Sequence, residues 1–191
     1  MKHYYIPFDL TLNINYLYLI GLYDIAEYNI QDSCFNTIKY NSLKEIAEYL
    51  NISYNTLNNL LNNADYRLFF SIDKKQKTIT LNNNFNNKKG NKQPFVMLNE
   101  KEVETIRRYK DNLLFKYYLY IKYFCGYSKR KQDFTAKQFL DYCGYSSKSN
   151  NYLNKIASFN AILSESGLIK IVKYRDELGH TRNEYKLTTT L

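Results

Sequence analysis

The segment TAKQFLDYCGYSS, residues 135–147, carries the pattern that decides the fold of this chain. Thr135 is of a residue type that caps helix N-termini, and the spacing of apolar residues after it predicts a short helix from Ala136 to Cys143. Gly144 predicts a tight turn, because glycine adopts backbone conformations that other residues avoid. A short helix followed at once by such a turn indicates two helices that cross at a steep angle.

A longer helix and a β-hairpin are expected after this turn. Ser146 or Ser147 is the expected cap of the helix, and Gly167 supplies its C-terminal stop. Strands are then predicted over 168–174 and 183–187, because β-branched and aromatic residues are frequent there and turn-forming residues separate the two runs.

A long apolar segment precedes the motif. Asn99 and Glu102 have the spacing of a capping box, which predicts a helix start. Apolar residues at helical spacing follow, either as one helix or as two joined near Asp111, and Gly126 ends the pattern. The tyrosines of this segment are expected to fill a core or an interface more often than to stack on unpaired bases. They are Tyr117, Tyr118, Tyr120 and Tyr123.

The first half of the chain repeats this order. Residues 42–53, SLKEIAEYLNIS, align with residues 135–146 at a constant offset of 93. Both segments have a hydroxyl cap, a lysine two residues later, two apolar residues, an acid, a tyrosine and a final serine. We therefore expect the chain to contain two copies of one unit. The elements expected in the first copy are helices over 12–28 and 43–50, a third helix capped by Ser53, and strands over 67–72 and 78–81.

A polar segment separates the two copies. Residues 81–94, LNNNFNNKKGNKQP, are low in complexity and include a glycine and a proline, which is typical of a linker. We therefore expect one domain over 1–82, a linker over 83–94 and a second domain over 95–191.

The positive charge lies mostly in the second half. The chain has 27 Lys and Arg and 18 Asp and Glu, a net charge of +9. Residues 1–90 contain 9 basic and 8 acidic residues, and residues 91–191 contain 18 and 10. Clustered cations favour a nucleic-acid partner, because lysines near phosphates release counterions. The alternative is that the charge only keeps the protein soluble.

The predicted element order resembles that of winged helix-turn-helix domains. The segments FLDYCGYSS, residues 139–147, and LSESGLIKI, residues 163–171, carry this resemblance. It implies a mostly α fold with small β-hairpin wings (α+β), arranged as two tandem winged helix-turn-helix domains. In such domains the second helix of the motif enters the major groove. Two of them in one small basic chain are similar to plasmid and phage replication initiators, whose paired winged-helix domains bind repeated origin sequences.

The expected DNA-binding residues lie on the third helix of each copy, on the wings and in a basic loop. Asparagine pairs with adenine edges, and lysine reaches guanine or a phosphate. In the second half they are Lys129, Arg130, Lys131, Ser147, Lys148, Ser149, Asn150, Asn151, Asn154, Lys155, Arg175, His180 and Arg182. In the first half they are Tyr54, Asn55, Thr56, Asn58, Asn59, Lys74, Lys75 and Lys77.

Several other classes of protein are not expected. No apolar run reaches the roughly 20 residues of a membrane span, and no signal peptide is recognisable. Cys34, Cys125 and Cys143 lack metal-site spacing, which favours buried, reduced thiols in a cytoplasmic protein. The two histidines and the lack of paired carboxylates or a phosphate-binding loop predict no catalytic residues, no metal, no cofactor and no small-molecule substrate.

The sequence therefore predicts a sequence-specific protein that binds double-stranded DNA and is not an enzyme. Origin recognition in plasmid or phage replication is the role that the resemblance favours. A transcriptional regulator and a partition or conjugation adaptor use the same scaffold and stay open. A homodimer, or contacts with other replication or regulatory proteins, is compatible with each role. The alternative from another class is a winged-helix protein-interaction module, which the near-neutral first half would suit.

Overall fold

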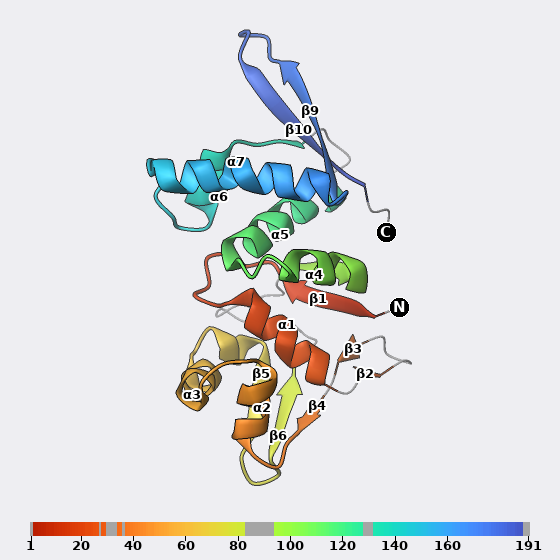
Figure 1. Cartoon of the computed structure of the whole chain (residues 1–191), viewed down its shortest axis with the longest axis vertical. Coiled ribbons are helices and arrows are strands. Elements are labelled where there is room, and N and C mark those ends of the chain that lie inside the picture. Colours follow the sequence, from red (N-terminus) through yellow and green to blue (C-terminus); the bar gives the residue numbers. More distant parts are fainter. Residues whose placement is uncertain are drawn as a thin grey trace. The chain divides into compact units, whose positions relative to one another are not determined.

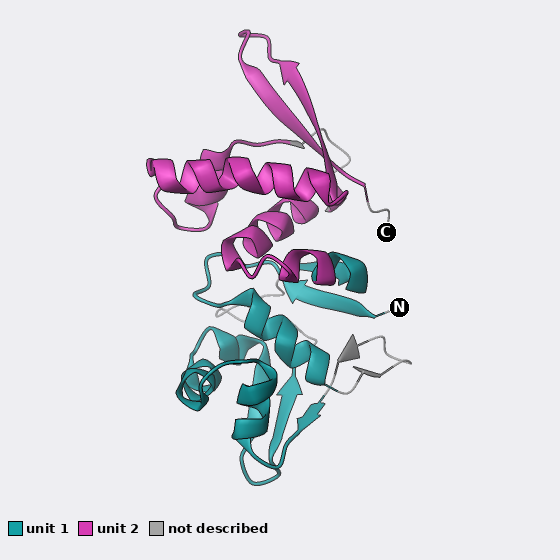
Figure 2. Cartoon of the chain, viewed as in Figure 1, with its two compact units in different colours: residues 1–103 teal, residues 104–191 magenta. Residues whose placement is uncertain are grey.

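The chain forms two compact units of mixed α and β structure. The computed structural model describes residues 2–26, 28–29, 34–35, 37–82, 94–127 and 132–188. Unit 1 spans Met1–Val103 and unit 2 spans Glu104–Leu191 (Figure 2). Each unit combines helices with small antiparallel sheets (Figure 1).

Unit 1 has a three-stranded sheet with strand order β4-β6-β5, and two-stranded sheets β1-β7 and β2-β3. Its elements are β1 (His3–Pro7), α1 (Tyr16–Ile25), β2 (Tyr28–Asn29), β3 (Cys34–Phe35), β4 (Thr37–Lys39), α2 (Leu43–Tyr49), α3 (Tyr54–Asn62), the 3-10 helix η1 (Tyr66–Leu68), β5 (Phe70–Asp73), β6 (Thr78–Leu81) and β7 (Phe95–Asn99).

Unit 2 has a three-stranded sheet with strand order β8-β10-β9. The helix that opens it begins within unit 1, so the boundary between the units falls inside that helix. The elements are α4 (Glu100–Arg107), α5 (Asn112–Tyr127), β8 (Gln132–Asp133), α6 (Ala136–Tyr142), α7 (Asn150–Glu165), β9 (Ile169–Arg175) and β10 (Thr181–Leu187).

The two units repeat one topology. In each, a short strand is followed by two helices and a β-hairpin, and the last strand of the hairpin lies between the other two strands. In unit 1 this series is β4-α2-α3-β5-β6, and in unit 2 it is β8-α6-α7-β9-β10. We call β5–β6 (residues 70–81) hairpin 1 and β9–β10 (residues 169–187) hairpin 2.

The first helix of each pair begins with the expected cap. The Ser42 hydroxyl accepts a hydrogen bond from the Lys44 N–H at 3.2 Å. The Thr135 hydroxyl accepts from the Gln138 N–H at 3.2 Å, and the Gln138 side chain accepts from the Thr135 N–H at 2.7 Å. These bonds satisfy N–H groups that have no partner inside a helix, so residue type alone fixes both starts.

The turn after this helix is the same in both units. Asn51 has φ of 54° and Gly144 has φ of 73°, both in the left-handed region. The next N–H donates to the carbonyl five residues earlier, at 3.0 Å in unit 1 and 2.9 Å in unit 2. Glycine and asparagine tolerate this conformation best, which explains why the chain has them at these two positions.

Tyrosine fills the core of unit 2, as expected. Tyr117, Tyr118 and Tyr120 are buried. The ring of Tyr117 lies 4.9 Å from that of Phe139, centroid to centroid, and its hydroxyl donates to Asn160 at 2.8 Å. Burial raises the pKa of Tyr120 to about 12. These contacts fix α5 against α6 and α7 and leave the opposite face of α7 to solvent.

The structure resolves the long segment before the motif into two helices. The Asn99 and Glu102 side chains each accept the other's N–H, at 2.9 and 2.8 Å, which confirms the predicted capping box. Lys110, with φ of 51°, ends the link between α4 and α5. Asp111 then caps α5 by accepting from the N–H groups of Leu113 and Leu114, at 2.8 and 3.2 Å.

Two sequence-based expectations about helix starts are wrong. Ser146 and Ser147 do not cap α7; the Ser146 carbonyl accepts from the Ser149 N–H at 3.2 Å, and Ser149 is the N-cap. The extra turn shifts the helix start to Asn150. In unit 1 the first helix starts at Tyr16, because the Asn15 side chain accepts from the Leu17 N–H at 3.0 Å.

Long-range strand pairing places the segment after residue 94 in unit 1. β7 pairs antiparallel with β1 over five residues, from His3 opposite Asn99 to Pro7 opposite Phe95. The compact units therefore divide after Val103. The expected division into 1–82, a linker over 83–94 and 95–191 stays a prediction, and residues 83–93 lie outside the described ranges.

Candidate nucleic-acid interface

The helix α3 presents an uncharged polar face in unit 1. Leu57, Leu60 and Leu61 are buried on its inner side. The helix sequence YNTLNNLLN contains no charged residue. The predicted site residues on this helix are all exposed: Tyr54, Asn55, Thr56, Asn58 and Asn59.

Some side chains on this face are hydrogen-bonded to neighbours in or just before the helix, and others are not. The Thr56 hydroxyl lies 2.8 Å from the Ser53 hydroxyl. The Asn62 amide donates to the carbonyl and the side-chain oxygen of Asn58, at 2.8 and 3.2 Å. Within the described ranges, the side chains of Asn55 and Asn59 make no hydrogen bond. They lie on one side of α3, four residues apart, and are available to a ligand.

The corresponding helix of unit 2, α7, presents a similar face with one cation. Ile156, Phe159 and Leu163 are buried. The predicted residues Asn150, Asn151, Asn154 and Lys155 are exposed on α7, while Ser147, Lys148 and Ser149 lie in the turn that precedes it.

The two lysines at this end of α7 differ in their partners. The Lys155 ammonium lies 3.3 Å from the Asp111 carboxylate, with its side chain 55% exposed. Lys148 is exposed and, in the part of the chain that the structure describes, has no ion pair or hydrogen bond. Lys148 is therefore the cation that is free to meet a phosphate, whereas Lys155 must first exchange its partner.

Hairpin 1 carries an exposed cationic tip. Lys74, Lys75 and Lys77 are all exposed. The Asp73 carboxylate holds the turn by accepting from the N–H groups of Lys75 and Gln76, at 2.8 and 3.0 Å. Three lysines on one fixed turn suit contacts to a phosphate backbone.

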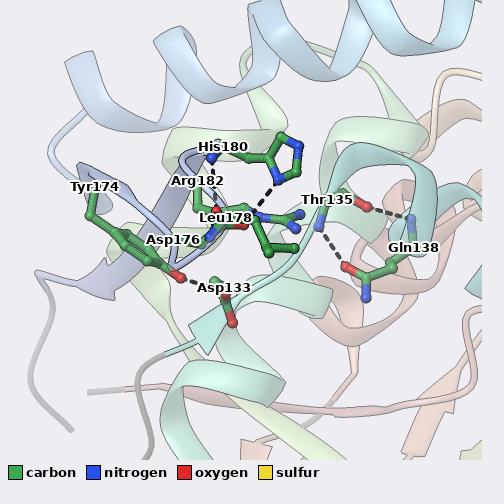
Figure 3. Close-up of polar contacts among 8 residues, drawn as sticks. All are labelled: Asp133, Thr135, Gln138, Tyr174, Asp176, Leu178, His180 and Arg182. Atoms are coloured by element: carbon green, nitrogen blue, oxygen red, sulfur yellow. Dashed lines mark hydrogen bonds and ion pairs between the residues drawn. The ribbon is translucent and has the colours of Figure 1, made fainter.

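In hairpin 2 two of the predicted DNA-binding residues, His180 and Arg182, contact one carboxylate. Asp176 accepts from the Arg182 Nε at 2.9 Å, and the His180 ring lies 3.5 Å away (Figure 3). The bond to Arg182 lowers the pKa of Asp176 and raises that of Arg182. A guanidinium has five N–H donors, of which this bond uses one. Arg175 and His180 are exposed, and Arg182 is half-exposed.

A cavity of about 470 Å³ lies between α7, the start of α6 and hairpin 2. Tyr174 at the hairpin donates a hydrogen bond to Asp133 at the edge of this cavity (Figure 3). Polar residues that sequence reasoning missed line it. They are Gln138, Asn160 and Asn183. Nothing in their sequence spacing signals this, because strand pairing and helix packing bring them together.

Two further residues that sequence reasoning missed do have a sequence signal. Lys44 of α2 and Lys137 of α6 stand at equivalent positions of the repeated segment, and both are exposed. The first helix of such a pair crosses the DNA backbone in helix-turn-helix proteins, so a cation there is suited to a phosphate contact.

Some predicted features fall outside these surfaces. Lys129, Arg130 and Lys131 lie outside the described residues.

Burial raises the pKa of Cys125 and of Cys143 to about 12, so both free thiols are protonated at neutral pH. Among the described residues, no group of three or more His, Cys, Asp or Glu is arranged to hold a metal ion. The described helices are all too short or too polar to cross a bilayer.

The charge difference between the halves holds for the observed units. Unit 1 has 11 basic and 10 acidic residues, net +1, and unit 2 has 16 and 8, net +8. Non-specific attraction to a polyanion therefore resides mainly in unit 2.

Comparison with known proteins adds one finding. Residues 19–61 match the family model of the NUMOD1 domain, a short helix-turn-helix-like DNA-binding domain of homing endonucleases. The match spans most of α1, all of α2 and nearly all of α3, which is less than a quarter of the chain. It supports a DNA-binding helical domain in unit 1. No curated protein and no solved structure matches the chain.

Proposed function

We propose that this protein binds double-stranded DNA sequence-specifically through two winged helix-turn-helix domains, one in each unit, without catalysing a reaction. The observation that carries the proposal is the repeat itself. The α2–turn–α3 segment, which the family match covers except for the last residue of α3, recurs in unit 2 as α6–turn–α7 with the same hydrogen-bonded turn. In each unit a hairpin with basic residues near its tip follows the second helix.

The polar faces of α3 and α7 support base recognition. Asn55 on α3, and Asn151 and Asn154 on α7, are exposed near the helix starts, where helix-turn-helix proteins contact base edges. Asn59 follows Asn55 by one turn on the same side of α3. An asparagine amide both donates and accepts, which suits adenine N6 and N7. Recognition of bases by α3 does not require charged side chains on this helix, because unit 2 supplies the attraction to phosphates.

Origin recognition in plasmid or phage replication is the biological role that we favour for this activity. Its support is the pairing of two such domains in one small basic chain. A transcriptional regulator or a partition adaptor would use the same surfaces. The position of the bound site separates these roles: an array of repeats beside AT-rich DNA indicates an origin, and a site overlapping a promoter indicates a regulator.

The test is a selection of bound fragments from random duplex DNA with the full chain, followed by footprinting. We expect enrichment of a defined sequence and protection of it by the protein. A protein that retains a protein partner after nuclease treatment, and shows no preference among duplexes, would instead be an interaction module. Nicking of supercoiled plasmid in the presence of Mg²⁺ would contradict the proposed lack of catalysis.

A matched pair of variants on α7 ties binding to the proposed face. Asn154→Asp places a carboxylate near the start of the helix, and Ser164→Asp places the same charge near its end. Both positions are exposed, so neither change should unfold the chain. We expect Asn154→Asp to weaken binding to the selected site at least tenfold and Ser164→Asp to change it little. Equal effects of the two variants would remove α7 from the interface.

A further inference from the structure

The tip of hairpin 2 exposes a leucine without an apolar neighbour to cover it. Leu178 is 80% exposed, whereas the next most exposed large apolar or aromatic side chain in the described ranges, Tyr49, is 54% exposed. Single exposed apolar residues are common on protein surfaces and by themselves mean little. Leu178 differs in where it stands and in how firmly its backbone is held.

The leucine stands at the end of a long, regular arm. β9 and β10 pair without interruption over seven residues each, from Ile169 opposite Leu187 to Arg175 opposite Thr181. The arm extends away from the helices of unit 2 (Figure 1). Two-stranded ribbons and sheets of other DNA-binding proteins contact the major or the minor groove, so the end of this arm can reach a groove of the duplex.

The turn that carries Leu178 is fixed by one carboxylate. Asp176 Oδ1 accepts from the N–H groups of Leu178 and His180, at 3.1 and 2.8 Å, and Oδ2 accepts from Arg182 Nε (Figure 3). The backbone adds a bond from the Gly179 N–H to the Asp176 carbonyl at 2.9 Å. Four bonds over one turn present the leucine in a defined position, so little ordering is needed when a ligand covers it.

The charge around the arm suits a polyanion. Residues 169–187 contain five Lys and Arg and three Asp and Glu, net +2. Two of the three carboxylates are already paired: Asp176 with Arg182, and Glu184 with Lys186 at 3.4 Å. Arg175 is exposed beside the tip. Hairpin 1 offers a contrast, because its tip has only polar and cationic residues and so suits phosphate contacts alone.

We propose that Leu178 is an apolar wedge that enters the minor groove of the bound duplex and partly unstacks one base step, so that unit 2 bends the DNA it binds. The proposal rests on the proposed function, because it needs a bound duplex. Leucine is one of the side chains that architectural proteins insert between base pairs, and such insertion kinks DNA by roughly 20–90°. Flexible pyrimidine–purine steps are the expected targets, because they unstack most easily.

The test measures binding and bending separately. The full chain is added at saturating concentration to a duplex carrying the selected site, labelled with a fluorophore at each end and with 2-aminopurine at the candidate step. Anisotropy reports binding, energy transfer reports the bend, and 2-aminopurine fluorescence reports unstacking. Wild-type protein should shorten the end-to-end distance and raise the 2-aminopurine signal.

Three variants separate the wedge from general effects. Leu178→Ala should at least halve the bend angle and abolish the 2-aminopurine signal while binding weakens less than about tenfold. Leu178→Met keeps a long apolar side chain and should retain both signals. Glu177→Gln, at the neighbouring exposed position, removes a repulsive charge and should tighten binding without changing the bend.

Each outcome decides the proposal. A wild-type complex that binds without bending, or a Leu178→Ala complex that bends as wild type does, overturns the wedge and leaves DNA binding standing. No binding to any duplex overturns both. Loss of a protein partner in Leu178→Ala, with an unchanged bend, would assign the leucine to protein docking instead.

Discussion

Replacing Lys148 by alanine isolates one cation of the proposed interface. Its side chain is exposed in the turn before α7 and has no partner in the described part of the chain, so the substitution should leave the fold intact. Each phosphate contact contributes about 0.9 to the slope of log affinity against log salt. Losing one contact therefore lowers the magnitude of the slope by about 0.9. The ratio of wild-type affinity to Lys148→Ala affinity should then fall by about 3.5-fold between 50 and 200 mM salt.

Fluorescence anisotropy titrations of the selected duplex at four or more salt concentrations measure this slope. Lys155→Ala should lower it by less than Lys148→Ala, because the Lys155 ammonium already lies 3.3 Å from the Asp111 carboxylate. Asp111→Asn provides the matched control. Its amide oxygen can still cap α5, while the released Lys155 should steepen the salt dependence.

Parallel slopes for wild type and Lys148→Ala would refute this reasoning, since they would mean that Lys148 approaches no phosphate. A larger slope change in Lys155→Ala than in Lys148→Ala would show that the ion pair with Asp111 does not restrain Lys155. An unchanged thermal unfolding midpoint for each variant checks that the fold is not the cause.

Two further predictions concern the turns that place these surfaces. Gly144→Ala should destabilise unit 2 by about 1–2 kcal/mol, because alanine is strained at a φ of 73°. Nothing lies within 4 Å of the added methyl, so a steric clash should not add to this cost. Urea unfolding would measure this, and Asn51→Gly at the equivalent turn should change stability by less than about 1 kcal/mol. The pKa of Asp176 should lie below its ordinary 3.8, because Arg182 favours the carboxylate. The turn of hairpin 2 should therefore keep its full stability above about pH 4 and lose this contribution as the pH falls through the lowered value. Carboxyl-carbon NMR should find the Asp176 midpoint below 3.8 in wild type and nearer 3.8 in Arg182→Gln.

The sequence contains the local signals for the helix–turn–helix pairs. A hydroxyl at Ser42 or Thr135 caps a helix within three residues, and Asn51 or Gly144 closes a turn within five. Such bonds depend on neighbours in the chain, so residue type and spacing are enough to place them. The same signals, repeated 93 residues apart, reveal the second copy.

The candidate site was partly accessible to the same reasoning. Exposure of Asn55, Asn59, Asn151 and Asn154 follows from helical periodicity once the buried leucines and isoleucines are identified. The ion-pair partner of Lys155 could not be predicted from the sequence, because Asp111 lies 44 residues earlier, at the start of α5. The sequence also did not predict a role for Leu178, because the exposure of a leucine in a turn is known only from the structure.

What the sequence alone determined about this protein is thus the order of its helices, the caps of α2, α3, α4 and α6, the turns after α2 and α6, and the uneven charge of its two halves. Only the tertiary structure decided that β7 pairs with β1, that the short strands β4 and β8 complete the two sheets, and that Asp176 fixes the tip of hairpin 2. The physical reason is range. Caps and turns are closed by hydrogen bonds between near neighbours, whereas strand pairing and ion pairs between elements depend on the packing of residues far apart in the chain.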